Sequence, residues 1–122
     1  MTKIIVRIIP ILILILILVA CKNDSNNEIV KTIQSPNGNY VAYLFKRNMG
    51  ATTKESYQLS ILRKGKEFGD NSGNIFIAYG EFDIEWVNDK ALMIKNKTIE
   101  KVFKDESVYD DITIRHYPSK TK

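Results

Sequence analysis

The 122-residue chain contains one cysteine, one histidine and three prolines. A single cysteine cannot form an intrachain disulfide, so the folded part depends on its hydrophobic core alone. One histidine and one cysteine are too few for the usual four-ligand zinc sites, and the sequence predicts no metal and no cofactor. After Ile29, no window of 11 residues has helical hydrophobic periodicity, which argues against a helical domain.

The chain also lacks a large excess of charge of one sign. Its 18 basic and 14 acidic residues give a formal net charge of +4. Lys3 and Arg7 supply two of the positive charges, so residues 21–122 carry only +2. This balance predicts no nucleic-acid partner.

The only long apolar run lies near the N-terminus. Lys3 and Arg7 precede apolar residues from Ile8 to Val19. A helix over residues 8–20 would cover about 20 Å, less than the ~30 Å hydrocarbon core of a bilayer. The run therefore favours a cleaved signal peptide over a retained membrane anchor. Such a signal can belong to a lipoprotein, or it can be an ordinary signal in which Cys21 is incidental.

The last residues of this run form the most specific motif in the chain. Leu18, Val19, Ala20 and Cys21 resemble the lipobox of bacterial lipoproteins. The resemblance implies cleavage after Ala20 and a diacylglyceryl group on Cys21. Two acyl chains hold a protein stably on a bilayer, so the expected location is the outer face of the cytoplasmic membrane, with the lipid on Cys21 as the membrane contact.

Four segments follow from this interpretation. We expect a signal peptide over residues 1–20, a lipidated cysteine and polar tether over 21–28, one β domain over 29–118 and a polar tail over 119–122. The tether between Cys21 and the domain reaches at most about 20 Å, which keeps the domain close to the membrane.

Hydrophobic residues in the domain repeat with a period of two, which is typical of strands with one buried face. Tyr57, Leu59 and Ile61 alternate with Gln58 and Ser60. Residues 40–45 are apolar at both alternating sets of positions, as in a central strand. About seven or eight strands are predicted, near residues 29–34, 40–48, 56–63, 74–79, 82–87, 91–95, 98–103 and 111–117. The expected fold is all-β, an antiparallel meander or a small β-sandwich.

Two turn motifs carry a resemblance to known proteins. Residues 35–43 (SPNGNYVAY) and 86–92 (WVNDKAL) resemble turn and strand motifs in the blades of TolB-like propellers. The chain is too short to close a propeller, so a propeller's binding funnel is not implied. With the lipobox, most of residues 29–117 resembles an uncharacterised family of small lipoproteins from Gram-positive bacteria. That resemblance implies a location and a β fold but no activity.

The segment from Arg47 to Thr53, which joins the predicted strands 40–48 and 56–63, is a possible binding loop. It is richer in small residues than a tight hairpin needs, and Gly50 permits a positive φ. A plain long hairpin is the favoured interpretation of the same residues. The candidate residues are Arg47, Asn48, Gly50, Thr52 and Thr53.

Carboxylates on the predicted strand 82–87 offer a second candidate site. Glu81, Asp83 and Glu85 repeat with period two, and paired carboxylates can hydrolyse glycosides. A solvated strand face is the favoured explanation of these carboxylates. His116 is expected to be a structural residue near the end of the last strand. Trp86 is expected on the apolar face of its strand.

The leading hypothesis is a non-enzymatic binding or accessory module with no catalytic residues, acting on an envelope protein or ligand. The alternatives are a small cell-envelope hydrolase that uses the strand-face carboxylates, and a protective or inhibitory factor for an envelope partner.

Overall fold

The computed structural model describes residues 27–48 and 54–119. Cys21 with its lipobox, and the loop residues Gly50, Thr52 and Thr53, lie outside the described residues. The described residues form nine strands: β1 (Asn27–Gln34), β2 (Tyr40–Asn48), β3 (Glu55–Arg63), β4 (Phe76–Tyr79), β5 (Phe82–Asn88), β6 (Ala91–Asn96), β7 (Lys101–Asp105), β8 (Val108–Tyr109) and β9 (Ile112–Tyr117). They contain no helix of the length and apolarity needed to span a bilayer.

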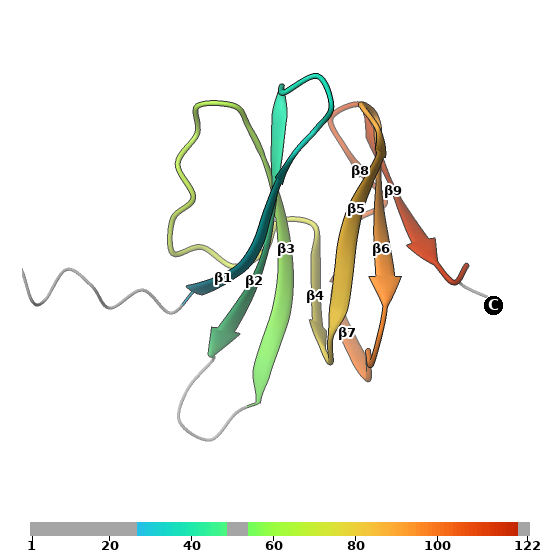
Figure 1. Cartoon of the computed structure of the whole chain (residues 1–122). Coiled ribbons are helices and arrows are strands. Elements are labelled where there is room, and N and C mark those ends of the chain that lie inside the picture. The colour runs from blue at the N-terminus through green and yellow to red at the C-terminus, as the bar shows by residue number, and fades with distance from the viewer. Residues whose placement is uncertain (1–26, 49–53, 120–122) are drawn as a thin grey trace, which may run out of the picture.

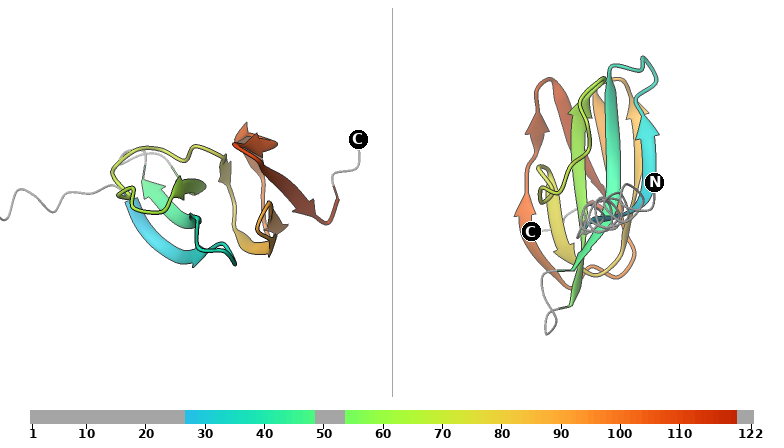
Figure 2. Two further views of the ribbon diagram at one scale, coloured as in Figure 1. Left: turned by 90° about the horizontal axis from the view of Figure 1, so that it is seen from above. Right: turned by 90° about the vertical axis from the view of Figure 1, so that its left-hand side faces the viewer.

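The strands form two sheets that pack face to face (Figures 1 and 2). One sheet has the order β1-β2-β3-β4-β7 and the other the order β5-β6-β9-β8. All neighbouring strands are antiparallel except β6 and β9, which are parallel. The all-β class and the sandwich architecture are therefore confirmed.

Three details differ from the sequence prediction. The two-residue strand β8 is too short to show alternation, so the expected seven or eight strands become nine. The expected strand 98–103 begins only at Lys101, because residues 97 and 98 bond to the carbonyl oxygen of Glu81 instead. After β6, the chain crosses to the other sheet, where β7 pairs with β4. It then returns to the sheet of β6 as β8 and β9, and this crossover allows β9 to lie parallel to β6.

The core lies between the two sheets and follows the period-two pattern. Phe76 and Phe82 meet edge to face, with ring centroids 5.0 Å apart. On β9, Ile112 and Ile114 are buried while the alternating residues Thr113 and Arg115 are exposed, as the period of two predicted. The buried cluster comprises Ala42, Leu44, Leu59, Ile61, Ile75, Phe76, Ala78, Phe82, Ile84, Leu92, Ile94, Ile112 and Ile114.

The outer face of β3 contradicts the prediction of a half-buried strand. Gln58 is fully buried and Ser60 is 5% exposed, although alternation places both away from the core. The connection between β3 and β4 covers them. Gly73 N donates to Gln58 Oε1 at 2.6 Å, and Asn74 N donates to Ser60 Oγ at 3.2 Å. These bonds satisfy polar groups that burial would otherwise destabilise.

The same connection covers β2, which is confirmed as a central strand. The Phe68 ring stacks on Tyr43, with centroids 4.6 Å apart, and meets Phe45 edge to face at 4.9 Å. Phe45 is fully buried. Figure 1 shows this connection, drawn in yellow-green, on the outer side of the five-stranded sheet. This sheet is thus buried on both faces along β2 and β3.

β1 contacts β5 across one side of the sandwich. Trp86 Nε1 donates to the carbonyl oxygen of Ile33 at 3.0 Å. Lys31 Nζ donates to Asp83 Oδ1 at 3.2 Å and to the carbonyl oxygen of Ile84 at 3.3 Å. Trp86 packs against the core, so the prediction that it lies on the apolar face of its strand is correct. It remains partly exposed, because it lies at the margin of the core.

Candidate functional site: a polar cleft at the turn end

The turns at one end of the sandwich enclose a polar cleft of about 430 Å³. Both sheets contribute to it. The β1–β2 and β5–β6 turns meet there directly, because Asn37 N donates to Asp89 Oδ1 at 2.7 Å. The lining residues are Asn37, Asn39, Tyr40, Arg63, Lys64, Asp89, Lys90 and Asp111. We call this cavity the turn-end cleft.

The β1–β2 turn is fixed by its own hydrogen bonds. Ser35 N donates to the carbonyl oxygen of Tyr40 at 2.9 Å, and Gly38 N donates to that of Ser35 at 2.8 Å. Gly38 has φ +75°, a conformation that glycine adopts without steric cost. Asn37 Oδ1 accepts bonds from Ser35 Oγ and Asn39 N. The turn is therefore a preformed wall of the cleft.

The β5–β6 turn forms the opposing wall. Lys90 N donates to Asn88 Oδ1 at 2.8 Å, which closes the turn locally. Thr113 N donates to the carbonyl oxygen of Lys90 at 2.8 Å, which ties the turn to β9. Lys90 Nζ lies 4.0 Å from Asp111 Oδ2. The turns within residues 35–43 and 86–92 thus belong to different sheets and meet at this cleft.

Asp110 joins the two sheets beside the cleft. Its Oδ2 accepts bonds from Arg63 Nε at 3.0 Å, Arg63 Nη2 at 2.8 Å and Tyr40 OH at 3.1 Å. The bonds from Arg63, followed by that from Tyr40, hold the pKa of Asp110 below its ordinary value. Desolvation and the carboxylate of Asp110 raise the pKa of Tyr40, so the tyrosine hydroxyl stays protonated and can donate to Asp110. Asp110 has φ +52°. This arrangement holds the Tyr40 side chain in place at the rim.

The sequence alone does not predict this cleft. Asn, Asp and Gly residues between strands indicate chain reversals, which is their commonest role. The available signal was the presence of two polar turn motifs, but their meeting depends on how the two sheets stack. Among residues 27–48 and 54–119, no group of three or more His, Cys, Asp or Glu residues is placed to hold a metal ion.

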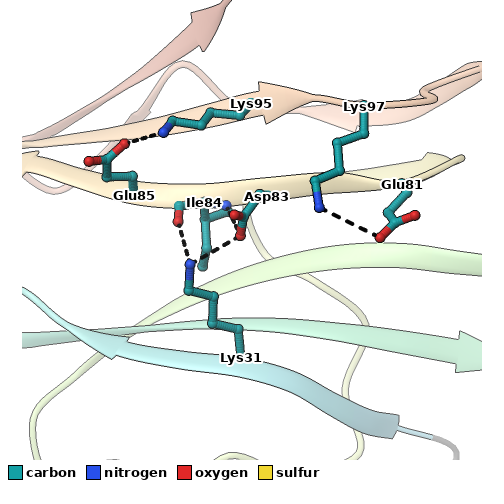
Figure 3. Close-up of polar contacts among 7 residues, drawn as sticks. All are labelled: Lys31, Glu81, Asp83, Ile84, Glu85, Lys95 and Lys97. Carbon is teal, nitrogen blue, oxygen red and sulfur yellow. Dashed lines mark hydrogen bonds and ion pairs between the residues drawn. The ribbon is translucent and has the colours of Figure 1, made fainter.

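The second candidate site, Glu81, Asp83 and Glu85, lies along β5 and does not line the cleft. We call these residues the acidic strand, and each carboxylate forms an ion pair with a different lysine (Figure 3). Glu81 lies 3.8 Å from Lys97 and Asp83 lies 3.2 Å from Lys31. The third ion pair joins Glu85 to Lys95. Partial burial opposes ionisation of Asp83, but bonds from the Ile84 N–H and from Lys31 keep its pKa below the ordinary value. These contacts are those of three separate ion pairs.

Arg47 and Asn48 are the described residues of the predicted loop site. Arg47 Nη1 donates to Asn27 Oδ1 at 2.7 Å and also to the carbonyl oxygen of Asp70. Asn48 ends β2 opposite Glu55. Arg47 thus connects the start of β1 to the β3–β4 connection, a structural contact that sequence could not reveal.

His116 lies where the two sheets approach each other. Its Nε2 is 3.2 Å from Asp105 Oδ1 of β7, and its ring is 5.5 Å from that of Phe76. The carboxylate favours the charged imidazolium, but burial of the ring has the larger effect and lowers the pKa of His116 below 6.5. The neutral form is therefore the one that the fold accommodates.

This histidine should make the stability of the domain depend on pH. Between the lowered pKa of His116 and about pH 6.5, the folded state binds fewer protons than the unfolded state. The contribution of His116 to stability is therefore complete above about pH 6.5 and declines as the pH falls through that window. We expect the free energy of unfolding in urea to decrease from pH 7.5 to 5.5, and to decrease less in His116→Gln. Equal decreases in both proteins would contradict this role for His116.

Comparison with known proteins gives one match. Residues 1–112 match DUF5412, described as a family of unknown function. No curated protein and no solved structure matches the chain. Because the match extends over most of the 122 residues, the chain belongs to the DUF5412 family.

Proposed function

We propose that this protein is a lipoprotein, anchored by Cys21 to the outer face of the cytoplasmic membrane, whose β domain is a non-enzymatic binding module. The observation that carries the binding role is the turn-end cleft, together with its distance along the chain from Cys21. β1 starts at Asn27, six residues after Cys21, and leads to the β1–β2 turn at its other end (Figure 1). An eight-residue strand spans about 26 Å, so the cleft would face away from the membrane.

The contacts of the acidic strand support binding over catalysis. A glycosidase needs two carboxylates that face one substrate, with one of them kept protonated near neutral pH. Here, Glu81, Asp83 and Glu85 each contact a different lysine, and the pKa of Asp83 is lowered. A protective or inhibitory factor would also act by binding, and it differs from the proposed module only in its partner.

The anchor can be tested independently of the ligand. Replacing Cys21 with serine removes the thiol that carries the lipid, and signal cleavage of lipoproteins follows lipidation. We expect Cys21→Ser to remain an uncleaved precursor and to incorporate no labelled palmitate. The measurement is metabolic labelling with electrophoresis of the membrane fraction. Substitution of Ser25, which has no part in the lipobox, is the matched control and should leave labelling unchanged. Persistent labelling of Cys21→Ser would exclude the proposed anchor.

A further inference from the structure

We infer that the turn-end cleft binds a saccharide of the cell envelope, held by hydrogen bonds from its charged and amide side chains against the ring of Tyr40. This inference rests on the proposed binding role and names its ligand class. Four chain segments that are distant in sequence converge on the cleft: the β1–β2 turn, the end of β3, the β5–β6 turn and the β8–β9 turn.

The charges of the cleft favour a neutral polar ligand. Its lining contains cationic and anionic side chains in similar number, and the guanidinium of Arg63 is already bound to Asp110. A lining of mixed charge attracts neither anions nor cations strongly as a whole. A saccharide hydroxyl both donates and accepts, so it can bond to a carboxylate and to an ammonium group at the same time.

Two side chains in the lining retain bonding capacity for such hydroxyls. The bond that Asp89 accepts from Asn37 uses Oδ1, and Oδ2 accepts none from a residue in the described part of the chain. Lys64 forms no ion pair with any residue of 27–48 or 54–119. A carboxylate acceptor and an ammonium donor therefore line one cavity, and hydrogen bonds to charged groups are the stronger kind.

Tyr40 adds an apolar surface whose position is fixed. Its hydroxyl donates to Asp110, and its ring meets that of Tyr109 edge to face, with centroids 6.3 Å apart. Pyranose rings have apolar C–H faces between their hydroxyls, and an aromatic ring supplies a rigid apolar surface for them. Because residues of the domain itself hold Tyr40 in this position, binding would cost little ordering of this side chain.

The size of the cleft and its place fit a short stretch of glycan. Ligand cavities commonly measure about 300 to 1,000 Å³, and the turn-end cleft measures about 430 Å³. Under the proposed anchoring, it would lie at the end of the domain that points away from the membrane, where envelope polysaccharides are accessible.

The test uses a double variant that keeps the net charge. Asp89→Asn retains an oxygen for the Asn37 N–H, and Lys64→Met removes the ammonium group, so the two changes cancel in charge. The full chain is purified in a zwitterionic detergent without a sugar headgroup and titrated calorimetrically with the N-acetylglucosamine trisaccharide and with maltotriose. We expect saturable binding of at least one saccharide, weakened at least tenfold in the double variant.

The matched control lies at the opposite end of the sandwich. Lys54 and Glu100 form an exposed ion pair, with Nζ 3.3 Å from Oε2. Lys54→Met with Glu100→Gln also leaves the net charge unchanged and should bind within twofold of wild type. The inference is overturned if neither saccharide binds, if inorganic phosphate binds more tightly than both, or if the control weakens binding equally. Palmitate labelling of Cys21 is unaffected by these outcomes, so failure of the saccharide proposal is distinguishable from failure of the anchor.

Discussion

Replacing Gly80 with alanine is expected to destabilise the domain by at least about 4 kcal/mol, a large part of the 5–15 kcal/mol typical of single domains. Gly80 connects β4 to β5, where the chain passes from one sheet to the other, and has φ +98°. A Cβ atom there would lie 2.0 Å from the carbonyl oxygen of Thr98 and 2.7 Å from Ile99 Cα. Both of these are backbone atoms.

The neighbouring backbone cannot move away without losing hydrogen bonds. Lys97 N and Thr98 N both donate to the carbonyl oxygen of Glu81, at 3.1 and 2.9 Å. Glu81 N in turn donates to Thr98 Oγ1 at 2.9 Å. Shifting residue 98 to admit a methyl group at Gly80 would strain or break this set, and the left-handed backbone adds about 1–2 kcal/mol for a non-glycine residue.

Gly38→Ala separates the backbone cost from the steric cost. Gly38 also has a positive φ, +75°, but nothing lies within 4 Å of a Cβ built there. Its alanine variant should lose only about 1–2 kcal/mol. In thermal melts followed by circular dichroism, Gly80→Ala should melt at least about 15 °C below wild type, or not fold at all. Similar midpoints for the two alanine variants would show that residues 97–99 yield readily to the new methyl group.

The strands that sequence predicted best are those with one face on the core and one in solvent. β5 and β9 follow this pattern, and Phe82 and Ile84 are buried as their alternation indicates. For such strands, the environment of each residue follows from its own position in the strand. Their burial can therefore be predicted without knowledge of the remaining fold.

Prediction failed where a residue's surroundings come from a distant segment. Gln58 alternates with apolar neighbours and was expected in solvent, but the β3–β4 connection buries it. The role of Gly80 depends on Thr98, which the antiparallel pairing of β5 with β6 brings close to it. The turn-end cleft likewise requires Asn37 and Asp89, from different sheets, to meet. No local pattern encodes these pairings.

Replacing Phe82 with alanine is expected to destabilise the domain by about 3–5 kcal/mol, because it removes a ring from the centre of the core. Phe82 is 1% exposed, and its ring contacts those of Phe76 and Tyr57, with centroids 5.0 and 6.4 Å away. The neighbours belong to the other sheet, so the cavity would lie between the layers. The measurement is urea unfolding at pH 7.5, where His116 is neutral.

Phe103 provides a control of the same residue type on an edge strand. It is 50% exposed on β7 and contacts Tyr79, with ring centroids 4.7 Å apart. Phe103→Ala should therefore cost about 1 kcal/mol, because the lost ring buries less area and leaves no enclosed cavity. Trp86→Ala should fall between the two, since the indole is partly exposed but donates to Ile33. If Phe103→Ala destabilises the domain as much as Phe82→Ala, burial between the two sheets is not what determines its stability.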